Sequence, residues 1–420
     1  MTPNESIMSI EDFVRPYKSF FSRKEAFKMA TKYVIGLMMD GERKSVEPMS
    51  ERVNASERSM QRLLTNVVWD HEGVLREYRK QMLNETWDPQ GILAVDDTGF
   101  PKKGKHSACV KRQYCPPLGK VANCQIGVSL TYVGRGVFWS YAMDLYVPKS
   151  WDILEDIECK NKRNEAKMPQ DAHYKSKWQM SLKQIESARN EQVPHRGIAA
   201  DSGYGMIPGF RKQLQAWHEQ YVVGIHSTSL VYTEPPIIPK PKPIKRRRGR
   251  PRKKPELMRT NAPSCKVSDL GKNVKDDEWE HLEIRKNSKG EPLIVQAVSR
   301  RIWPADEEEK DAILDESWLI IERRENENGG TELRYFLSNS PETMPTLDMV
   351  RLYHDRFWID HGYRHMKEEL GLDHHEGRSW IGWHRHVLLV SLAYGYLTLK
   401  QLEEKKREEY LKWVTLIDHG

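Results

Sequence analysis

The stretch from Pro235 to Pro255 cannot form part of a folded core, and it therefore limits how the rest of the chain can fold. It holds ten Lys or Arg, seven Pro and no acid. So little apolar surface cannot offset the entropy of ordering, and the prolines favour extended backbone. We expect an exposed linker or arm, with the core built from the residues on either side. The formal charge of the whole chain is +7, so the remainder carries −3 once these ten charges are set aside.

The overall composition is that of a soluble globular protein. The 420 residues predict two or three domains, and hydrophobic and charged residues make up 38% and 30% of the chain. No apolar run approaches the ~20 residues of a membrane span, and the N-terminus lacks a secretory signal pattern. The five cysteines include no C-x-x-C pair, which indicates a reducing compartment. We therefore expect a cytoplasmic protein with no membrane partner.

Residues 1–88 show helical periodicity. Met60 and Leu63 recur at helical spacing after Ser56, a suitable N-cap, and an earlier short helix would end near Val53. Two short helices and a tight turn are typical of a helix-turn-helix that binds DNA. Any small helical bundle produces the same pattern, so both interpretations stay open.

Residues 89–231 alternate between strands and helices. The predicted strands are residues 92–95, 125–133, 137–147, 198–200 and 221–225. The first is expected to stop before Asp96, the second and third to form a hairpin, and helices to precede and follow the fourth. This α/β order matches the ribonuclease-H-like arrangement.

The order changes after Glu234. We assign residues 232–345 to an insertion that holds the basic arm and antiparallel strands, with Gly329-Gly330 as a turn. The predicted strands of the insertion are residues 281–286, 293–303, 318–323 and 333–337. From residue 346 the pattern is helical, so residues 346–402 form the last part of the core and residues 403–420 a C-terminal tail.

Two aspartates follow short apolar strands. Asp97 and Asp201 are each followed within two residues by Gly, and ligands of open α/β sheets bind beyond the carboxyl ends of strands. Because side chains alternate along a strand, only one of Asp96 and Asp97 can face such a site. Two converging carboxylates repel unless a divalent cation such as Mg²⁺ neutralises them. Asp-Thr-Gly and Asp-Ser-Gly are equally typical of plain turns.

A polar stripe is expected on the helix that follows residue 346. Tyr353, Arg356, Asp360 and Lys367 fall at positions i, i+3, i+7 and i+14 of one helix. An acid flanked by a phenol and two cations suits phosphate chemistry, since the acid can bind a metal while the cations bind phosphate oxygens. A solvated face with helical ion pairs is the alternative.

The spacing of these four residues resembles the signature of bacterial insertion-sequence transposases of the DDE superfamily. Members of that group have a ribonuclease-H-like catalytic core, often with a β-rich insertion between the second and third acids. Their first acid directly precedes Thr, which matches Asp97 and not Asp96, and their second follows a short apolar strand, which matches Asp201. Residues 370–386 also resemble the segment that follows the signature.

The resemblance implies a function for each of these residues. Asp97, Asp201 and Asp360 would be the catalytic acids and would hold two Mg²⁺ ions, or Mn²⁺ in their place, which cut the transposon end and then join it to target DNA. Tyr353, Arg356 and Lys367 would bind DNA phosphates. The partners would be double-stranded DNA at transposon ends and target, and a second copy of the chain, so that a homodimer forms the synaptic complex. The protein would be bacterial and nucleoid-associated.

The third acid departs from the family, which has Glu where this chain has Asp360. Aspartate is one methylene shorter, so the helix has to approach more closely or the geometry loosens. The substitutes available nearby are Glu368, Glu369 and Glu376, none of which fits the signature. A transposase-derived DNA-binding protein without catalysis, and a ribonuclease-H-like nuclease that cuts without joining, are the alternatives.

Two further patterns concern DNA and metals. Arg248, Arg250 and Arg252 surround a Gly-Arg-Pro sequence typical of an AT-hook that lies in the minor groove, although a generic basic tether has the same composition. Seven of the 15 His lie between His354 and His386, but their spacing does not fit a structural zinc site.

Overall fold

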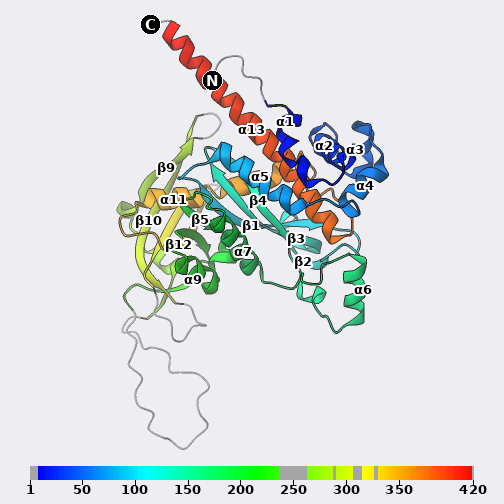
Figure 1. The fold of residues 1–420 in the computed structure, drawn as a ribbon. Helices are drawn as coiled ribbons and strands as arrows, with labels where there is room; N and C mark the ends of the chain where they lie inside the picture. The colour runs from blue at the N-terminus through cyan, green and yellow to red at the C-terminus, as the bar shows by residue number, and fades with distance from the viewer. Residues whose placement is uncertain (1–7, 236–262, 287–289, 306–314, 326–329, 419–420) are drawn as a thin grey trace, which may run out of the picture. The chain divides into compact units, whose positions relative to one another are not determined.

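The computed structural model describes residues 8–235, 263–286, 290–305, 315–325 and 330–418 (Figure 1). The chain forms two compact units, Met1–Arg196 with Phe357–Gly420, and Gly197–Arg356. The fold is mixed α/β, with a ribonuclease-H-like core and additional helices, as the order of predicted elements indicated.

The N-terminal part of the first unit is helical, as its periodicity predicted. Its elements are α1 (Ile10–Val14), η1 (Arg15–Phe20), α2 (Lys24–Met38), α3 (Val46–Arg52), α4 (Glu57–Thr65) and α5 (His71–Thr86). The predicted N-cap is confirmed, because the Ser59 N–H donates to Ser56 Oγ at 3.3 Å. Asn54, in the turn between α3 and α4, has a φ of 46°, a left-handed conformation that Asn tolerates well.

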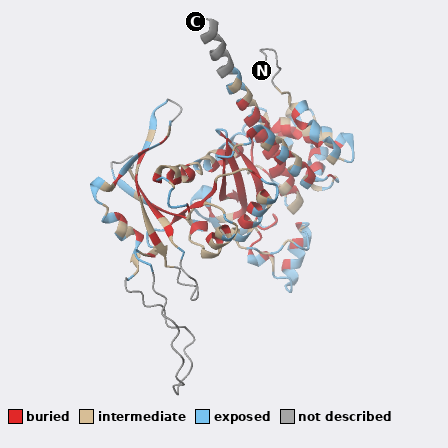
Figure 2. Cartoon of the chain, turned by 60° about the vertical axis from the view of Figure 1, so that its left-hand side comes forward, coloured by how far each residue is buried: buried red, intermediate tan, exposed pale blue. Residues whose placement is uncertain are grey.

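The sheet of the first unit is antiparallel and centred on one long strand. Its strands are β1 (Ile92–Pro101), β2 (Lys111–Cys115), β3 (Lys120–Gly134) and β4 (Val137–Leu145). β3 pairs with all three of the others, and the predicted hairpin of β3 and β4 is confirmed. β1, β4 and the part of β3 from Cys124 onward are largely buried, whereas β2 is mostly exposed (Figure 2).

The prediction that the first strand stops before Asp96 is wrong. β1 continues through Asp96 and Asp97 as far as Pro101, because β3 runs beside it down to Cys124. Asp97 therefore lies opposite Val128 within the ladder and not in a loop. Pairing with a strand that is distant in sequence outweighs the local turn preference of Asp and Gly.

Helices pack on both faces of this sheet. The remaining helices of the first unit are η2 (Pro116–Leu118), η3 (Lys149–Trp151), α6 (Ile157–Glu165), α7 (Lys177–Asn190), α12 (Phe357–Glu368) and α13 (Trp380–Asp418). α7 packs against β3, and α12 packs against β1 and β4. α13 contacts β4 and also α2, α4 and α5, so it joins the sheet to the N-terminal helices.

The second unit is built on a sheet that begins with a parallel pair. Its elements are β5 (Gly197–Ala200), α8 (Ser202–Gly205), α9 (Pro208–Ala216), β6 (Tyr221–Ile225), β7 (Leu230–Tyr232), β8 (Cys265–Lys266), α10 (Val267–Lys272), η4 (Asp276–Glu278), β9 (Glu280–Lys286), β10 (Pro292–Pro304), β11 (Ser317–Glu325), β12 (Thr331–Ser338) and α11 (Thr346–His354). The predicted strands at 198–200 and 221–225 are confirmed as β5 and β6, which run parallel.

The strands that follow the basic arm continue the same sheet. β12 pairs antiparallel with β6, then β11 with β12 and β10 with β11, while β7 and β9 both pair with β10. All four strands predicted in this part of the chain are present. The predicted turn at Gly329, and the arm from residue 236 onward, lie outside the described residues.

The prediction of one continuous helix after residue 346 is wrong. α11 ends at His354 and α12 begins at Phe357, with Asp355 and Arg356 in a turn between them. The Arg356 N–H bonds the carbonyl oxygen of Tyr353 at 3.0 Å, three residues back instead of four. This tightened turn breaks the stripe, so Tyr353 belongs to α11 while Asp360 and Lys367 share α12. A second break separates α12 from α13, where Gly371 has a φ of 63°.

No helix among the described residues has the length and apolarity needed to cross a bilayer.

A buried arginine joins α4 to α13. Arg385, which is 5% exposed, donates from Nη1 to the carbonyl oxygens of Leu63 and Leu64 at 3.1 and 3.2 Å. These carbonyls belong to the last turn of α4, where the helix itself supplies no donors. Burial lowers the pKa of Arg385 to about 10, which leaves it charged at neutral pH.

We expect Arg385→Met to lower the free energy of unfolding by about 3 kcal/mol, because buried carbonyl groups lose charged donors. Lys405→Met, at an exposed position of the same helix, is the control and should change stability by less than about 0.5 kcal/mol. Urea denaturation followed by circular dichroism measures both. Equal stability of the two variants would show that Arg385 does not hold α4.

Candidate active site

Asp97 lies within β1, and a lysine holds its carboxylate. Lys177, the first residue of α7, places Nζ 3.0 Å from Oδ1 and 2.9 Å from Oδ2 of Asp97. The Asp97 side chain is only 14% exposed. A carboxylate this far from water needs a compensating charge, and Lys177 supplies it.

Asp96 and Asp97 point to opposite faces of the sheet, because side chains alternate along a strand. Asp97 faces α7. Asp96 lies opposite Ser129, whose hydroxyl forms a hydrogen bond with the phenol of Tyr363 on α12. Asp96 Oδ1 also accepts the Asp97 N–H at 2.7 Å. The first unit thus has one aspartate on each face of β1.

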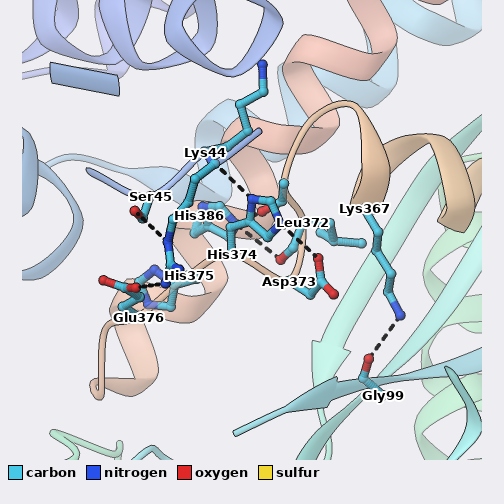
Figure 3. Close-up of polar contacts among 12 residues, drawn as sticks. Lys44, Ser45, Gly99, Lys367, Leu372, Asp373, His374, His375, Glu376 and His386 are labelled. Carbon is cyan, nitrogen blue, oxygen red and sulfur yellow. Dashed lines mark hydrogen bonds and ion pairs between the residues drawn. The ribbon is translucent and has the colours of Figure 1, made fainter. Parts of the chain in front are cut away.

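Three residues of α12 share the face that meets the sheet. Asp360, Tyr363 and Lys367 are spaced i, i+3 and i+7, so they lie in one row. Lys367 Nζ donates to Thr98 Oγ1 at 2.7 Å and to the Gly99 carbonyl oxygen at 2.9 Å, as Figure 3 shows for Gly99. Asp360 lies in the first turn of α12 and is exposed. The helix is therefore fastened to β1 next to Asp97.

Tyr363 of α12 is buried against the face of β1 that carries Asp96. Burial raises the pKa of the Tyr363 phenol well above its usual value, and the charges of Asp96, Asp97 and Asp360 raise it further. Asp96 lies on the face of β1 that Tyr363 contacts through Ser129, whereas Asp97 lies on the opposite face with Lys177.

The segment after α12, residues 370–376, is held against α13 (Figure 3). His386 Nε2 donates to the carbonyl oxygens of Gly371 and Leu372 at 3.2 and 3.1 Å. Its Nδ1 accepts from Tyr33 OH at 2.9 Å, so the hydrogen-bond partners indicate the neutral tautomer. Burial lowers the pKa of His386 to about 4, in agreement with a neutral ring.

The same segment also contacts the loop between α2 and α3 and the residue that follows β1. The Lys44 N–H donates to His374 Nδ1 at 3.0 Å, and Lys102 Nζ donates to the carbonyl oxygen of His375. The histidines of this part of the chain therefore act as hydrogen-bonding partners that fix the loop behind α12.

In the second unit, Asp201 follows β5 directly, as predicted, and caps α8. Its Oδ1 accepts the Gly203 N–H at 2.9 Å. α8 lies so close to β6 that a Cβ on Gly205 would be 2.0 Å from the carbonyl oxygen of Gly224. Glycine is therefore required at position 205, because any side chain would push Asp201 away from β6.

Tyr353 lies near the same part of β6. Its hydroxyl oxygen would be 3.3 Å from a Cβ on Gly224, a position that is also 3.0 Å from the backbone nitrogen of Ser202. The ring of Tyr353 packs on Phe336 of β12, with centroids 4.1 Å apart. The second unit thus brings the Asp201 turn and Tyr353 together on β6.

A buried ion network fixes the end of α11. Glu322 of β11 is fully buried, and its Oε2 lies 2.5 Å from His354 Nε2. Arg324 Nε lies 2.5 Å from Glu322 Oε1. Burial alone raises the pKa of Glu322, but the hydrogen bond from His354 and the charges of His354 and Arg324 outweigh it and lower the pKa below the usual value. His354 directly follows Tyr353, so this network sets the position of the phenol.

The predicted acids are suitable ligands for a hard divalent cation, since carboxylate oxygens are what Mg²⁺ prefers. Within the described residues, no group of three or more His, Cys, Asp or Glu is close enough together to hold a metal ion. Asp97 nevertheless already binds a cation, the ammonium group of Lys177, with both carboxylate oxygens. Lys177 therefore has to move before a divalent cation can bind both oxygens of Asp97.

Four predicted DNA-binding arginines remain, one after α11 and three in the basic arm. Arg356 lies in the turn between α11 and α12 and is partly exposed. Arg248, Arg250 and Arg252 of the basic arm lie outside the described residues, so the AT-hook stays a prediction.

Sequence reasoning missed Lys177 and Tyr363. The spacing of Tyr363, one turn after Asp360, is a signal that could have been used. Lys177 gave no such signal, because it lies 80 residues from Asp97 in an ordinary helix start.

The chain was compared with known protein families and proteins. The family described as "DDE superfamily endonuclease" matches residues 16–291. The matched range includes Asp97 and Asp201 and ends before Asp360.

One similar protein is the "Probable transposase for insertion sequence element IS701" of Microchaete diplosiphon. It is 26% identical over 230 residues, which are 54% of this chain and 56% of that protein. The chain therefore aligns with little more than half the length of this relative.

We expect Lys177→Met to bind Mn²⁺ more tightly than the wild type, by about tenfold, because no ammonium group then competes for Asp97. Isothermal titration with Mn²⁺ measures the change. Lys183→Met, at an exposed position of the same helix, is the matched control. Unchanged or weaker Mn²⁺ binding in Lys177→Met would contradict the competition.

We expect Glu322→Gln to lower the free energy of unfolding by about 3 kcal/mol at pH 7, since a buried ion pair loses one partner. The folded-state pKa of Glu322 is lowered, so its contribution is present above the unfolded pKa of about 4.3 and is lost as pH falls through the folded value. Denaturation at pH 7 and near pH 3 measures the difference in unfolding free energy between the wild type and Glu322→Gln, which should be smaller at pH 3. Glu332→Gln, in an exposed pair on β12, is the control; an equal effect there would refute the assignment.

Proposed function

The chain belongs to the DDE superfamily of endonucleases, and on that premise we propose that it is the transposase of an insertion sequence. It would cut DNA at the ends of the element and join the freed 3′-hydroxyls to a target strand. The observation that carries this proposal is the family match, which includes Asp97 and Asp201. The contacts of Lys367 with Thr98 and Gly99, which fasten α12 to β1 directly after Asp97, support it. The similarity to a probable transposase of an insertion sequence agrees with it.

Asp97, Asp201 and Asp360 are proposed as the metal ligands, with Mg²⁺ or Mn²⁺ as the cofactor. When bound, such a cation lowers the pKa of a coordinated water and stabilises charge on the leaving oxygen of a phosphodiester. Asp360 is exposed, whereas Asp97 is largely buried and must first be released by Lys177. Asp201 joins this set on the family signature.

The cationic and phenolic groups are proposed to bind the phosphates of the element end. Tyr353 is held by Phe336 and by the neighbouring ion network, so its hydroxyl is positioned before DNA arrives. Arg356 offers a planar fork for phosphate oxygens. Lys367 fixes β1 through Thr98 and Gly99, and we propose that it exchanges one of these contacts for a phosphate.

The rest of the chain is proposed to serve DNA binding and assembly. In this proposal residues 1–88 bind DNA, 89–231 and 346–402 form the catalytic core, and 232–345 form the insertion with its arm. α4 suits a helix-turn-helix, because it buries Met60, Leu63 and Leu64 and exposes its remaining face. Pairing two element ends calls for a homodimer on double-stranded DNA, at the nucleoid of a bacterial cell.

A second candidate is a DNA-binding protein that descends from a transposase and no longer cuts. The observation in its favour is Asp360 in place of the family's Glu, because the shorter side chain reaches less far from α12.

The test uses a duplex carrying the inverted repeats that flank the gene, with Mg²⁺. We expect the wild type to nick and join it, and Asp97→Asn, Asp201→Asn and Asp360→Asn to lose about a hundredfold or more in rate, since each removes a charged ligand. Asp360→Glu restores the family residue and should stay active. Asp96→Asn, on the opposite face of β1, is the matched control.

Each other outcome selects an alternative. Binding without nicking by both the wild type and Asp360→Glu would favour the DNA-binding protein. Nicking without joining would favour a nuclease. A greater loss in Asp96→Asn than in Asp97→Asn would move the first acid to Asp96.

A further inference from the structure

The first unit contains a strongly basic segment that has no part in the proposed catalytic site. From Thr98 to Met143 the chain has seven Lys or Arg and no Asp or Glu. Outside the basic stretch from Pro235 to Pro255, the chain carries a net charge of −3, and these seven cations lie in that acidic remainder. They are therefore concentrated locally, immediately after Asp97 in sequence.

Five of these cations lie on a hairpin that extends past the end of β1. β1 makes its last pair, Pro101 with Cys124, while β2 continues to pair with β3 as far as Lys120. We call residues 103–123 the basic hairpin. Its exposed cations are Lys103, Lys105, Lys111, Arg112 and Lys120.

The basic hairpin has no carboxylates of its own to neutralise it. Across the described residues, none of its five exposed cations forms an ion pair with Asp or Glu. Lys102, by contrast, turns inward to the carbonyl oxygen of His375 and so is not part of this surface. Unpaired cations grouped on one hairpin attract a polyanion.

Exposed apolar groups lie among these cations. Tyr114 and Val121 are cross-strand partners, 59% and 53% exposed, and Leu118 at the turn is 44% exposed. Exposed apolar side chains that are scattered singly are common, whereas three of them on one hairpin among unpaired cations are typical of a contact surface. Cations interleaved with an exposed tyrosine are the combination that contacts phosphates and also packs on sugars or bases.

The hairpin begins beside the candidate active site. Val128, the partner of Asp97, and Lys120 are eight residues apart on β3. At a rise of about 3.3 Å per residue the hairpin reaches about 26 Å beyond Asp97. This is about eight base pairs of duplex at 3.4 Å each.

We propose that the basic hairpin binds the duplex next to the phosphodiester that is cut, with its five cations on phosphates and Tyr114 against the sugars or bases. This inference rests on the proposed function, because the bond that is cut lies at Asp97 only if Asp97 is a catalytic acid. The hairpin is a DNA-binding surface distinct from the basic arm and from α4.

The test measures binding to a fluorescent duplex of mixed sequence without terminal repeats, in EDTA so that no cutting occurs, over a range of salt concentrations. The variant replaces Lys103, Lys105, Lys111 and Arg112 with Gln. The slope of log affinity against log salt is negative, and each lost phosphate contact makes it less steep by about 0.9. We therefore expect the magnitude of the slope to decrease by about three to four in this variant. Replacing Lys160 and Lys183, exposed on α6 and α7, with Gln is the control and should leave the slope unchanged.

Further variants keep the test decisive. If the fourfold variant does not fold, Lys103→Gln with Lys105→Gln alters only the loop outside both strands and should lower the slope by about two. Tyr114→Ala should weaken binding by about fivefold or more without changing the slope.

An unchanged slope in the folded hairpin variants would overturn the inference while leaving the proposed function intact. If the wild type bound no duplex at low salt, the proposed function would itself fail, and the inference with it.

Discussion

The candidate active site depends on the contact that Lys367 makes with β1. By donating to Thr98 Oγ1 and the Gly99 carbonyl oxygen, it fastens α12 one residue beyond Asp97. Asp360 lies two turns before Lys367 on the same helix face, so the anchor also sets where that carboxylate lies. Burial at this contact lowers the pKa of Lys367 below its usual value. Tyr363 on Ser129 is the second point of attachment between α12 and the sheet.

Charge compensation organises the surroundings of this anchor. Asp97 is neutralised by Lys177 from one face of the sheet, and Glu322 by His354 and Arg324 near Tyr353. Each ion pair holds a buried carboxylate that would otherwise be costly, and each fixes a group that the proposed reaction uses. The five exposed cations of the basic hairpin, by contrast, form no ion pair within the described residues.

Local signals were sufficient for much of the fold. Ser56 as an N-cap, β6 at Tyr221–Ile225 and the turn after Asp201 depend on a few neighbouring residues, and all three agree with the structure. The wrong predictions concern elements whose structure depends on residues that are distant in sequence. β1 runs past Asp97 because β3 pairs with it, and nothing near residue 97 reveals that partner. The break between α11 and α12 contains neither Pro nor Gly, so the helical pattern continues across it. Lys177 was missed for the same reason, because its partner is 80 residues away.

The central claim is that Asp97, Asp201 and Asp360 hold one metal site, and iron-directed cleavage tests it without relying on activity. Fe²⁺ replaces Mg²⁺ in the wild-type protein with DNA bound, and ascorbate with hydrogen peroxide then generates radicals that cut the polypeptide beside the ion. The account predicts cuts in three segments, around Asp97, Asp201 and Asp360, all of which excess Mg²⁺ suppresses. Cuts near Asp97 and Asp360 with none near Asp201, or cuts that Mg²⁺ leaves unchanged, would contradict it.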